Sequence, residues 1–312
     1  MAENMVEEDL NKLIIKQHGI NKFSFGIQIL IWLSIFFGCF LLAQLLGGSI
    51  IVIYYKSVDI TKIAANADDL NVLRYTQMLT SVLGFLFPAL IFSKLKDHPI
   101  TKFSNANIGF APVFLILIPL LIVTIYPVIN ASFFINKWMP WSEWMKDSQG
   151  EYKAIVDALL SDKSIFIFIL NFITIAALPA ICEEWIFRGT LQKILTEKLN
   201  IHLAVFLAAV FFSFIHFEFS GFLPRVILGV FLGYLFYYSG SLWLNIFAHL
   251  LNNGAQIVIM YLNTLGIYKY DVDNPEMPHI WELILYSIGF SALWFLFYHF
   301  ARKRKNSIFG KI

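Results

Sequence analysis

Residues 164–192 read SIFIFILNFITIAALPAICEEWIFRGTLQ, and this stretch decides the class of fold. Its apolar run is long enough to cross a lipid bilayer, which takes about 20 mostly apolar residues. Towards its end the run nevertheless contains Glu183, Glu184 and Arg188. Ionisable groups inside a membrane are costly and mark function by default. The stretch therefore predicts a transmembrane helix that carries part of a functional site.

The composition of the whole chain is that of a membrane protein. Of its 312 residues, 58% are hydrophobic and only 14% are charged, whereas a soluble domain carries about 25% charged residues. The long apolar runs lie at 24–54, 72–93, 111–134, 164–192, 202–217, 222–238, 241–266 and 281–300. We therefore expect an all-α fold, a polytopic membrane bundle of about eight transmembrane helices.

The chain is expected to form one membrane domain between two short flanks. Residues 1–23 are predicted to be a cytoplasmic N-terminal segment, because acidic residues precede the first apolar run, unlike in a cleavable signal peptide. Residues 24–300 are predicted to form the transmembrane bundle, with a functional core at about 164–266. Residues 301–312 are predicted to be a basic cytoplasmic tail. The Trp-rich segment 135–163 is expected to lie at the membrane interface.

Charge and cysteine usage narrow the surroundings of the protein. The net charge of +2 is too small to indicate a nucleic acid as partner. When the N-terminus is placed in the cytoplasm, the inner segments hold more Lys and Arg than the outer ones. We therefore expect both termini on the cytoplasmic side of a bacterial plasma membrane, with the lipid bilayer as partner. Cys39 and Cys182 lie in apolar runs, where a disulfide is not expected.

Strongly polar side chains collect on three apolar runs in the second half of the chain. Besides the acidic pair, His216 lies in the run 202–217, and His249 and Asn253 lie in the run 241–266. Counted at 1.5 Å per residue from the expected cytoplasmic ends, these groups are about 13–21 Å deep. That depth is near the middle of a hydrocarbon core about 30 Å thick. Polar groups of separate helices at one depth predict a single site.

Helical geometry gives the charged residues different surroundings. Glu184 and Arg188 are four residues apart, so they share one helix face and can pair. Glu183 points about 100° away from Glu184 and is free for another task. His249 and Asn253 also share a helix face.

A carboxylate with two imidazoles is sufficient for hydrolysis. Glu183 can accept a proton from water, and Asn253 can donate its amide to a developing oxyanion. Alternatively, Glu183, His216 and His249 can bind zinc, because two His and one Glu form a known catalytic Zn²⁺ site. Both versions lead to amide hydrolysis inside the membrane, and these residues leave the metal open.

Most of these polar residues also have a structural explanation, whereas Glu183, an intramembrane carboxylate without an adjacent partner of its own, is hard to explain by packing. The ion pair of Glu184 with Arg188 can be purely structural. A single buried His is more often a packing residue than a catalyst. Asn245 and Asn252 are expected to form hydrogen bonds between helices. Glu218 and Arg225 flank a short loop and are expected to be solvated. The convergence of the other groups at one depth favours a site.

At these residues the sequence resembles the CPBP family, which comprises the type 2 CAAX prenyl endopeptidases and the bacterial Abi, bacteriocin-processing relatives. The resemblance rests on three motifs in order: Glu183-Glu184-x-x-x-Arg188, Phe212-x-x-x-His216 and His249-x-x-x-Asn253. Any one motif alone is weak, but the three together are specific. The motifs span residues 183–253, and the surrounding helices suit the eight-helix bundle of that family.

The resemblance implies a role for each motif residue. Glu183 and His216 are expected to activate the hydrolytic water, and His249 and Asn253 to stabilise the oxyanion. Glu184 and Arg188 are expected to hold the site in shape. Whether a Zn²⁺ ion is required stays open under the resemblance.

We therefore expect an intramembrane endopeptidase whose substrate is a membrane-embedded or lipidated protein or peptide, including the prenylated CAAX type. Two alternatives belong to other classes of protein. One is a catalytically idle family member that serves in bacteriocin immunity or as a scaffold. The other is a proton-coupled transporter, which inverted repeats would support; the sequence shows no internal repeat.

Overall fold

The computed structural model describes residues 19–66, 70–269 and 276–309, and the regular elements within these ranges are all helical. The first half contains η1 (Gly19–Lys22), α2 (Phe25–Tyr55), α3 (Ile60–Asn66), α4 (Asn71–Ser81), η2 (Val82–Leu86), α5 (Phe87–Leu95), α6 (Ile100–Phe103), α7 (Phe114–Lys137) and α8 (Glu143–Leu160). The second half contains α9 (Ile165–Asn171), η3 (Phe172–Ala177), α10 (Leu178–Ile186), η4 (Phe187–Gln192), α11 (Lys193–Thr196), α12 (Ile201–Phe214), α13 (Phe222–Ser239), α14 (Leu242–Thr264) and α15 (Ile280–Phe309). The predicted all-α class is confirmed.

Length and composition support fewer membrane spans than the sequence suggested. Within the described residues, six helical stretches are long and apolar enough to cross a membrane: Phe25–Tyr55, Asn71–Leu95, Phe114–Lys137, Ile165–Thr196, Phe222–Ser239 and Ile280–Arg304. The chain is therefore an integral membrane protein, but a count of eight spans is not reached. The predicted run 202–217 forms α12, which has only 14 residues. The run 241–266 forms α14, whose amide side chains and His249 make it more polar.

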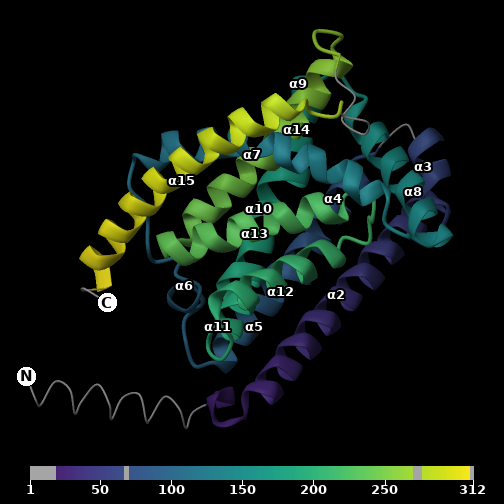
Figure 1. Cartoon of the computed structure of the whole chain (residues 1–312). Coiled ribbons are helices and arrows are strands. Elements are labelled where there is room, and N and C mark those ends of the chain that lie inside the picture. Colours follow the sequence, from purple (N-terminus) through teal and green to yellow (C-terminus); the bar gives the residue numbers. More distant parts are fainter. Residues whose placement is uncertain (1–18, 67–69, 270–275, 310–312) are drawn as a thin grey trace, which may run out of the picture.

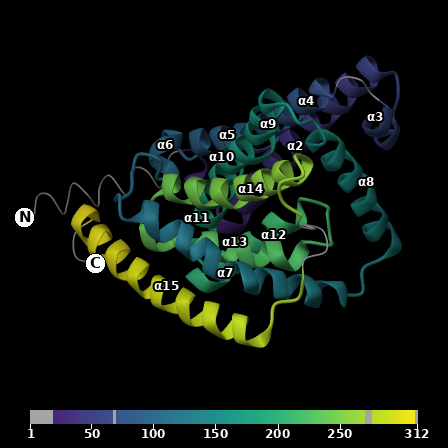
Figure 2. The same cartoon turned by 90° about the horizontal axis from the view of Figure 1, so that it is seen from above.

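The central helices lie between two long peripheral ones. α10, α13 and α14 occupy the middle of the bundle, with α2 on one side and α15 on the other (Figure 1, Figure 2). α2 contacts α4, η2 and α5, whereas α15 contacts α7 and α13. One cluster of buried side chains, which includes Phe36 and Phe212, packs the α2 side. Another, which includes Phe114 and Phe297, packs the α15 side.

Two π-helical turns flank the short helix α10. η3 precedes it and η4 follows it, all within one span. Pro179, in the first turn of α10, has no N–H and its ring would clash with the carbonyl four residues earlier. The wider π turn accommodates this, and the N–H of Leu178 bonds to the carbonyl of Ile173, five residues back. The π turns therefore set the orientation of α10, which carries the two adjacent acidic residues.

Small residues bring α12 and α13 into close contact. A Cβ atom added at Gly229 would lie 2.9 Å from the Ala209 Cβ, and one added at Gly233 would lie 2.7 Å from Val205. The spacing Gly229-x-x-x-Gly233 places both glycines on one face of α13, as in small-residue interfaces of membrane helices. The backbone of α13 therefore approaches α12 more closely than side chains would allow.

The flanks differ in part from the expected boundaries. Residues 301–309 continue α15, so this part of the predicted tail is helical and joined to the bundle. The segment 135–163, expected at the membrane interface, includes α8, which contacts α3, α9 and α14. Residues 1–18 of the predicted N-terminal segment lie outside the described residues.

Overpacking the α12–α13 contact should destabilise the bundle. We expect Gly229→Ala to cost about 1–3 kcal/mol, because its methyl group would collide with Ala209. Thermal unfolding in detergent measures this loss. The matched control is Gly48→Ala, because a Cβ at Gly48 meets nothing within 4 Å. Ala209→Gly should restore part of the stability of Gly229→Ala; equal stability of the two single glycine variants would contradict the close contact.

Candidate active site

Glu184 is a charged group inside the bundle whose two carboxylate oxygens both have partners. Its carboxylate is fully buried, and its Oε1 atom accepts from Arg188 Nη1 at 2.7 Å and faces His249 Nδ1 at 2.8 Å. The Oε2 atom accepts from Asn245 Nδ2 at 3.3 Å. These partners come from η4 and α14, so one carboxylate joins three elements.

Arg188 extends the same network to α13. Its Nη2 atom donates to the carbonyl oxygen of Gly229 at 3.1 Å, and its guanidinium lies 4.9 Å from the centre of the Phe212 ring. Side-chain exposure is 1% for Arg188 and 0% for Glu184, so water does not reach the pair. The ion pair predicted from the i,i+4 spacing is present.

Glu183 lies on the other side of α10 and faces two imidazoles. Its Oε2 atom is 3.7 Å from His249 Nε2 and 4.0 Å from His216 Nε2. Both distances exceed those of a direct hydrogen bond. The three side chains therefore converge on a gap instead of bonding to one another.

Hydrogen bonds of the two imidazoles assign their tautomers. Nδ1 of His216 lies 2.7 Å from the carbonyl oxygen of Phe212, and Nδ1 of His249 lies 2.8 Å from the Glu184 carboxylate. A carbonyl and a carboxylate only accept hydrogen bonds, so each Nδ1 carries the proton. In the neutral rings, both Nε2 atoms then present lone pairs towards Glu183. With Glu183 ionised, a water molecule or an added proton must supply the donor hydrogens in the gap.

The group opens on one side only. The side chain of His216 is 28% exposed and that of Glu183 is 11% exposed, whereas His249 and Glu184 are 2% and 0% exposed. A small molecule such as water can therefore reach the gap from the His216 side, while the Glu184 side is closed.

Asn253 lies one helical turn beyond His249 on α14. Its Oδ1 atom accepts from Asn252 Nδ2 at 3.1 Å. Within the described part of the chain, no hydrogen bond joins it directly to the Glu183 group. Of the residues expected to form the site, five are in mutual contact: Glu183, Glu184, Arg188, His216 and His249.

The zinc set expected as one alternative does not fit this geometry. Tetrahedral zinc with bonds of about 2.0–2.1 Å requires ligand atoms about 3.3–3.4 Å apart, and the Oε2–Nε2 distances of 3.7 and 4.0 Å are longer. The described residues contain no group of three or more His, Cys, Asp or Glu side chains that could hold a metal ion. We therefore derive no chemical step through a metal.

Two further residues near the site were expected to be solvated, and this prediction was wrong. Arg225 and Glu218 form an ion pair, with side chains only 21% and 11% exposed. Arg225 stands at the start of the apolar run 222–238, where a cation is itself a sign of function. That signal was available from the sequence.

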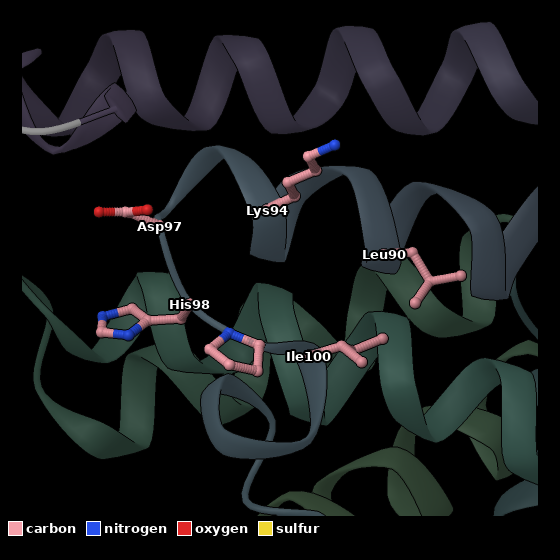
Figure 3. Close-up of a pocket in the computed structure, with 6 residues that line it drawn as sticks. Leu90, Lys94, Asp97, His98 and Ile100 are labelled. Atoms are coloured by element: carbon pink, nitrogen blue, oxygen red, sulfur yellow. The ribbon is translucent and has the colours of Figure 1, made fainter.

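A surface pocket lies apart from this group, where α5 leads into α6 (Figure 3). Its lining consists of Leu90, Lys94, Asp97, His98, Pro99 and Ile100. It shares no residue with the acid–imidazole group. The group around Glu183 therefore remains the candidate for chemistry.

Buried carboxylates and imidazoles that converge in an all-helical membrane protein are a combination that can support hydrolysis within the membrane. Residues 165–255 match the family model described as Type II CAAX prenyl endopeptidase Rce1-like. This segment of the chain thus belongs to the type II CAAX prenyl endopeptidase (CPBP) family, and the match includes all three motifs. No curated protein and no solved structure matches the chain.

Removing Arg188 should unfold the site, because it leaves a buried carboxylate without its cation. We expect Arg188→Ala to cost about 3–5 kcal/mol and to lower the folded yield and the unfolding temperature in detergent. Lys62→Ala is the matched control, since the pair of Lys62 with Asp59 is exposed and such pairs contribute little. Equal thermal stability of the two variants would show that the buried pair does not hold the bundle.

Proposed function

We propose that the protein is an intramembrane endopeptidase that hydrolyses a peptide bond of a membrane-associated, lipidated protein or peptide of the CAAX type. The observation that carries this proposal is the convergence of Glu183 Oε2 and the Nε2 atoms of His216 and His249 within 4.0 Å. The family match over residues 165–255 supports the same reaction.

The attacking water would lie between Glu183 and His216. Polar atoms separated by more than about 3.5 Å are commonly bridged by water, and a water about 2.8 Å from both atoms spans their 4.0 Å separation. Glu183, assisted by the Nε2 lone pair of His216, takes a proton as the water oxygen attacks the carbonyl carbon. The same proton then passes to the nitrogen of the leaving amine as the C–N bond breaks. The products are a new carboxyl terminus and a free amine.

His249 and Asn253 would stabilise the oxyanion of the tetrahedral intermediate. Because His249 Nδ1 donates to Glu184, its Nε2 atom can donate to an oxyanion only when the ring is doubly protonated. Asn253 would add its amide N–H from the next turn of α14. Glu184 acts through His249 and is a positioning residue, and Arg188 holds Glu184 in place.

The bilayer would present the substrate laterally to the functional core at about 164–266. An enzyme that acts on a lipidated protein must meet it where its lipid is anchored, and the apolar exterior of the bundle is suited to that environment. We also propose that both termini face the cytoplasm, from the distribution of Lys and Arg.

Replacing Glu183 should abolish activity without unfolding the protein. Glu183→Gln keeps the shape of the side chain but removes its capacity to accept a proton, so we expect cleavage to fall by about 10²–10⁴-fold. His216→Ala and His249→Ala should be similarly damaging, and the double variants should lose much less than the product of the single losses because the residues act as a unit.

The measurement is cleavage of a lipidated peptide library by purified protein in lipid. Glu143→Gln, at an exposed position on α8, controls for the loss of a carboxylate. A catalytically idle scaffold would show no cleavage by the wild-type protein. Wild-type cleavage by well-folded Glu183→Gln would overturn the assignment of the base.

Metal removal should leave cleavage intact, because the Glu183–His216–His249 group does not fit a metal as it stands. We expect the protein to keep its activity after treatment with 1,10-phenanthroline and dialysis. Elemental analysis of the same sample checks that zinc is absent. Loss of activity that returns on addition of Zn²⁺ would show that the side chains close around an ion in the active state.

A further inference from the structure

The turn between α12 and α13 lies within the depth of the bilayer. α12 has 14 residues and is therefore about 21 Å long, which is shorter than a hydrocarbon core of about 30 Å. Glu197 and Lys198 mark its other end as the polar surface. Non-helical backbone at this depth is tolerated only where protein or a water-filled cavity satisfies it. The turn, residues 215–221, includes His216, and its backbone polar groups therefore need partners from the protein.

Asn136 of α7 holds this turn in place. Its Nδ2 atom donates to the carbonyl oxygens of Phe219 and Ser220 at 2.9 and 2.7 Å, and its Oδ1 atom accepts from the N–H of Leu223 at 3.0 Å. The indole N–H of Trp141 donates to the Asn136 carbonyl at 3.0 Å. The far side of the turn is therefore closed by protein.

The first turn of α13, directly after this loop, contains a cation with unused donors. Arg225 Nη1 donates to Glu218, which also accepts from Ser220 Oγ and from the N–H of Gly221. The Nε and Nη2 atoms of Arg225 are buried and have no hydrogen-bond partner among the described residues. A buried donor without an acceptor is destabilising, and more so when it is charged.

A second buried arginine shows how such a residue is normally satisfied. Arg74 donates from Nε to Asn171 at 2.7 Å, from Nη1 to Asn71 at 3.1 Å and from Nη2 to the Leu159 carbonyl at 2.7 Å. Each of its three nitrogens thus has an acceptor within the protein. Arg225 has an acceptor for Nη1 only, so its buried Nε and Nη2 donors still lack one among the described residues.

The position of Arg225 relates it to the reaction. Glu218, the ion-pair partner of Arg225, is two residues from His216 in the sequence. The Nε–Nη2 edge of a guanidinium matches the two oxygens of a carboxylate, with two parallel hydrogen bonds. A carboxylate bound there would lie beside the hydrolytic group.

We propose that Arg225 binds the C-terminal carboxylate of the peptide substrate and is a specificity-determining residue for cleavage near a chain end. This inference rests on the proposed endopeptidase function. We infer a chain terminus as the ligand because Trp141 packs on Phe219 and Phe222 and closes the space behind the turn. A peptide that reaches Arg225 therefore ends there, and its terminal carboxylate supplies the missing acceptor.

The test compares one peptide in two chemical forms. A peptide ending in S-farnesyl-Cys-Val-Ile-Met is presented to the full-length protein in lipid nanodiscs as the free acid and as the C-terminal amide. We expect kcat/KM for the acid to exceed that for the amide by about 10- to 100-fold, the size expected for a charge-assisted bidentate contact. This comparison uses the wild-type protein and does not depend on the folding of any variant.

Variants of Arg225 complete a double-mutant cycle with the peptide forms. Arg225→Gln should lower kcat/KM for the acid much more than for the amide, so that the two forms are cleaved at similar rates. Arg225→Lys keeps the charge but not the paired donors, so it should fall between the two. Equal cleavage of acid and amide by the wild-type protein overturns the proposal. So does Arg225→Gln if it lowers both in the same proportion, because that result describes a structural role.

A binding measurement separates this inference from the proposed function. Fluorescent forms of the acid and amide peptides are titrated into the same nanodiscs. Preferential binding of the acid that depends on Arg225, without cleavage of either form, would overturn the endopeptidase and leave the carboxylate site standing. Cleavage of both forms at equal rates would overturn the carboxylate site and leave the endopeptidase standing. Neither binding preference nor cleavage would overturn both.

Discussion

The burial of the Glu184 carboxylate is the constraint on which the rest of the structure depends. A carboxylate in an apolar interior is tolerated only when it is paired and hydrogen-bonded. Glu184 meets this condition by contacts with Arg188 of η4 and with His249 and Asn245 of α14. Arg188 in turn bonds to the carbonyl of Gly229 on α13. Displacing any of these helices leaves a charge unpaired, so the carboxylate fixes how the central helices assemble.

Two adjacent acidic residues have different surroundings because a helix turns their side chains apart by about 100°. Glu184 faces inwards and is fully engaged, whereas Glu183 meets only a gap and two Nε2 lone pairs. His249 links the two carboxylates, since its Nδ1 atom faces Glu184 and its Nε2 atom faces Glu183. The buried Glu184 carboxylate thereby orients the His249 ring, whose other nitrogen faces Glu183. This arrangement requires the two residues to be neighbours in sequence.

Sequence reasoning succeeded where the chemistry depends on local spacing. The Glu184–Arg188 pair follows from the i,i+4 rule, and the approach of His216 and His249 to Glu183 follows from a common depth. The number of spans was overestimated because α12 is short and α14 is polar, and an apolar run does not reveal where its helix ends. The Arg225–Glu218 pair was missed because both residues flank a short loop, where charged side chains are expected to be solvated, although a cation at the start of an apolar run was a signal of function.

The shortness of α12 resolves a conflict inherent in hydrolysis within lipid. Water must reach a site that the apolar helices exclude from it, while every backbone group at that depth needs a partner. Because α12 ends early, a polar turn lies beside His216, where a full-length helix would have placed apolar side chains. Asn136 satisfies the carbonyls of that turn, and the close contact at Gly229 keeps α13 against α12 as the chain returns. The short helix thus places a polar turn beside the Glu183–His216–His249 group, where a longer helix would place further apolar side chains.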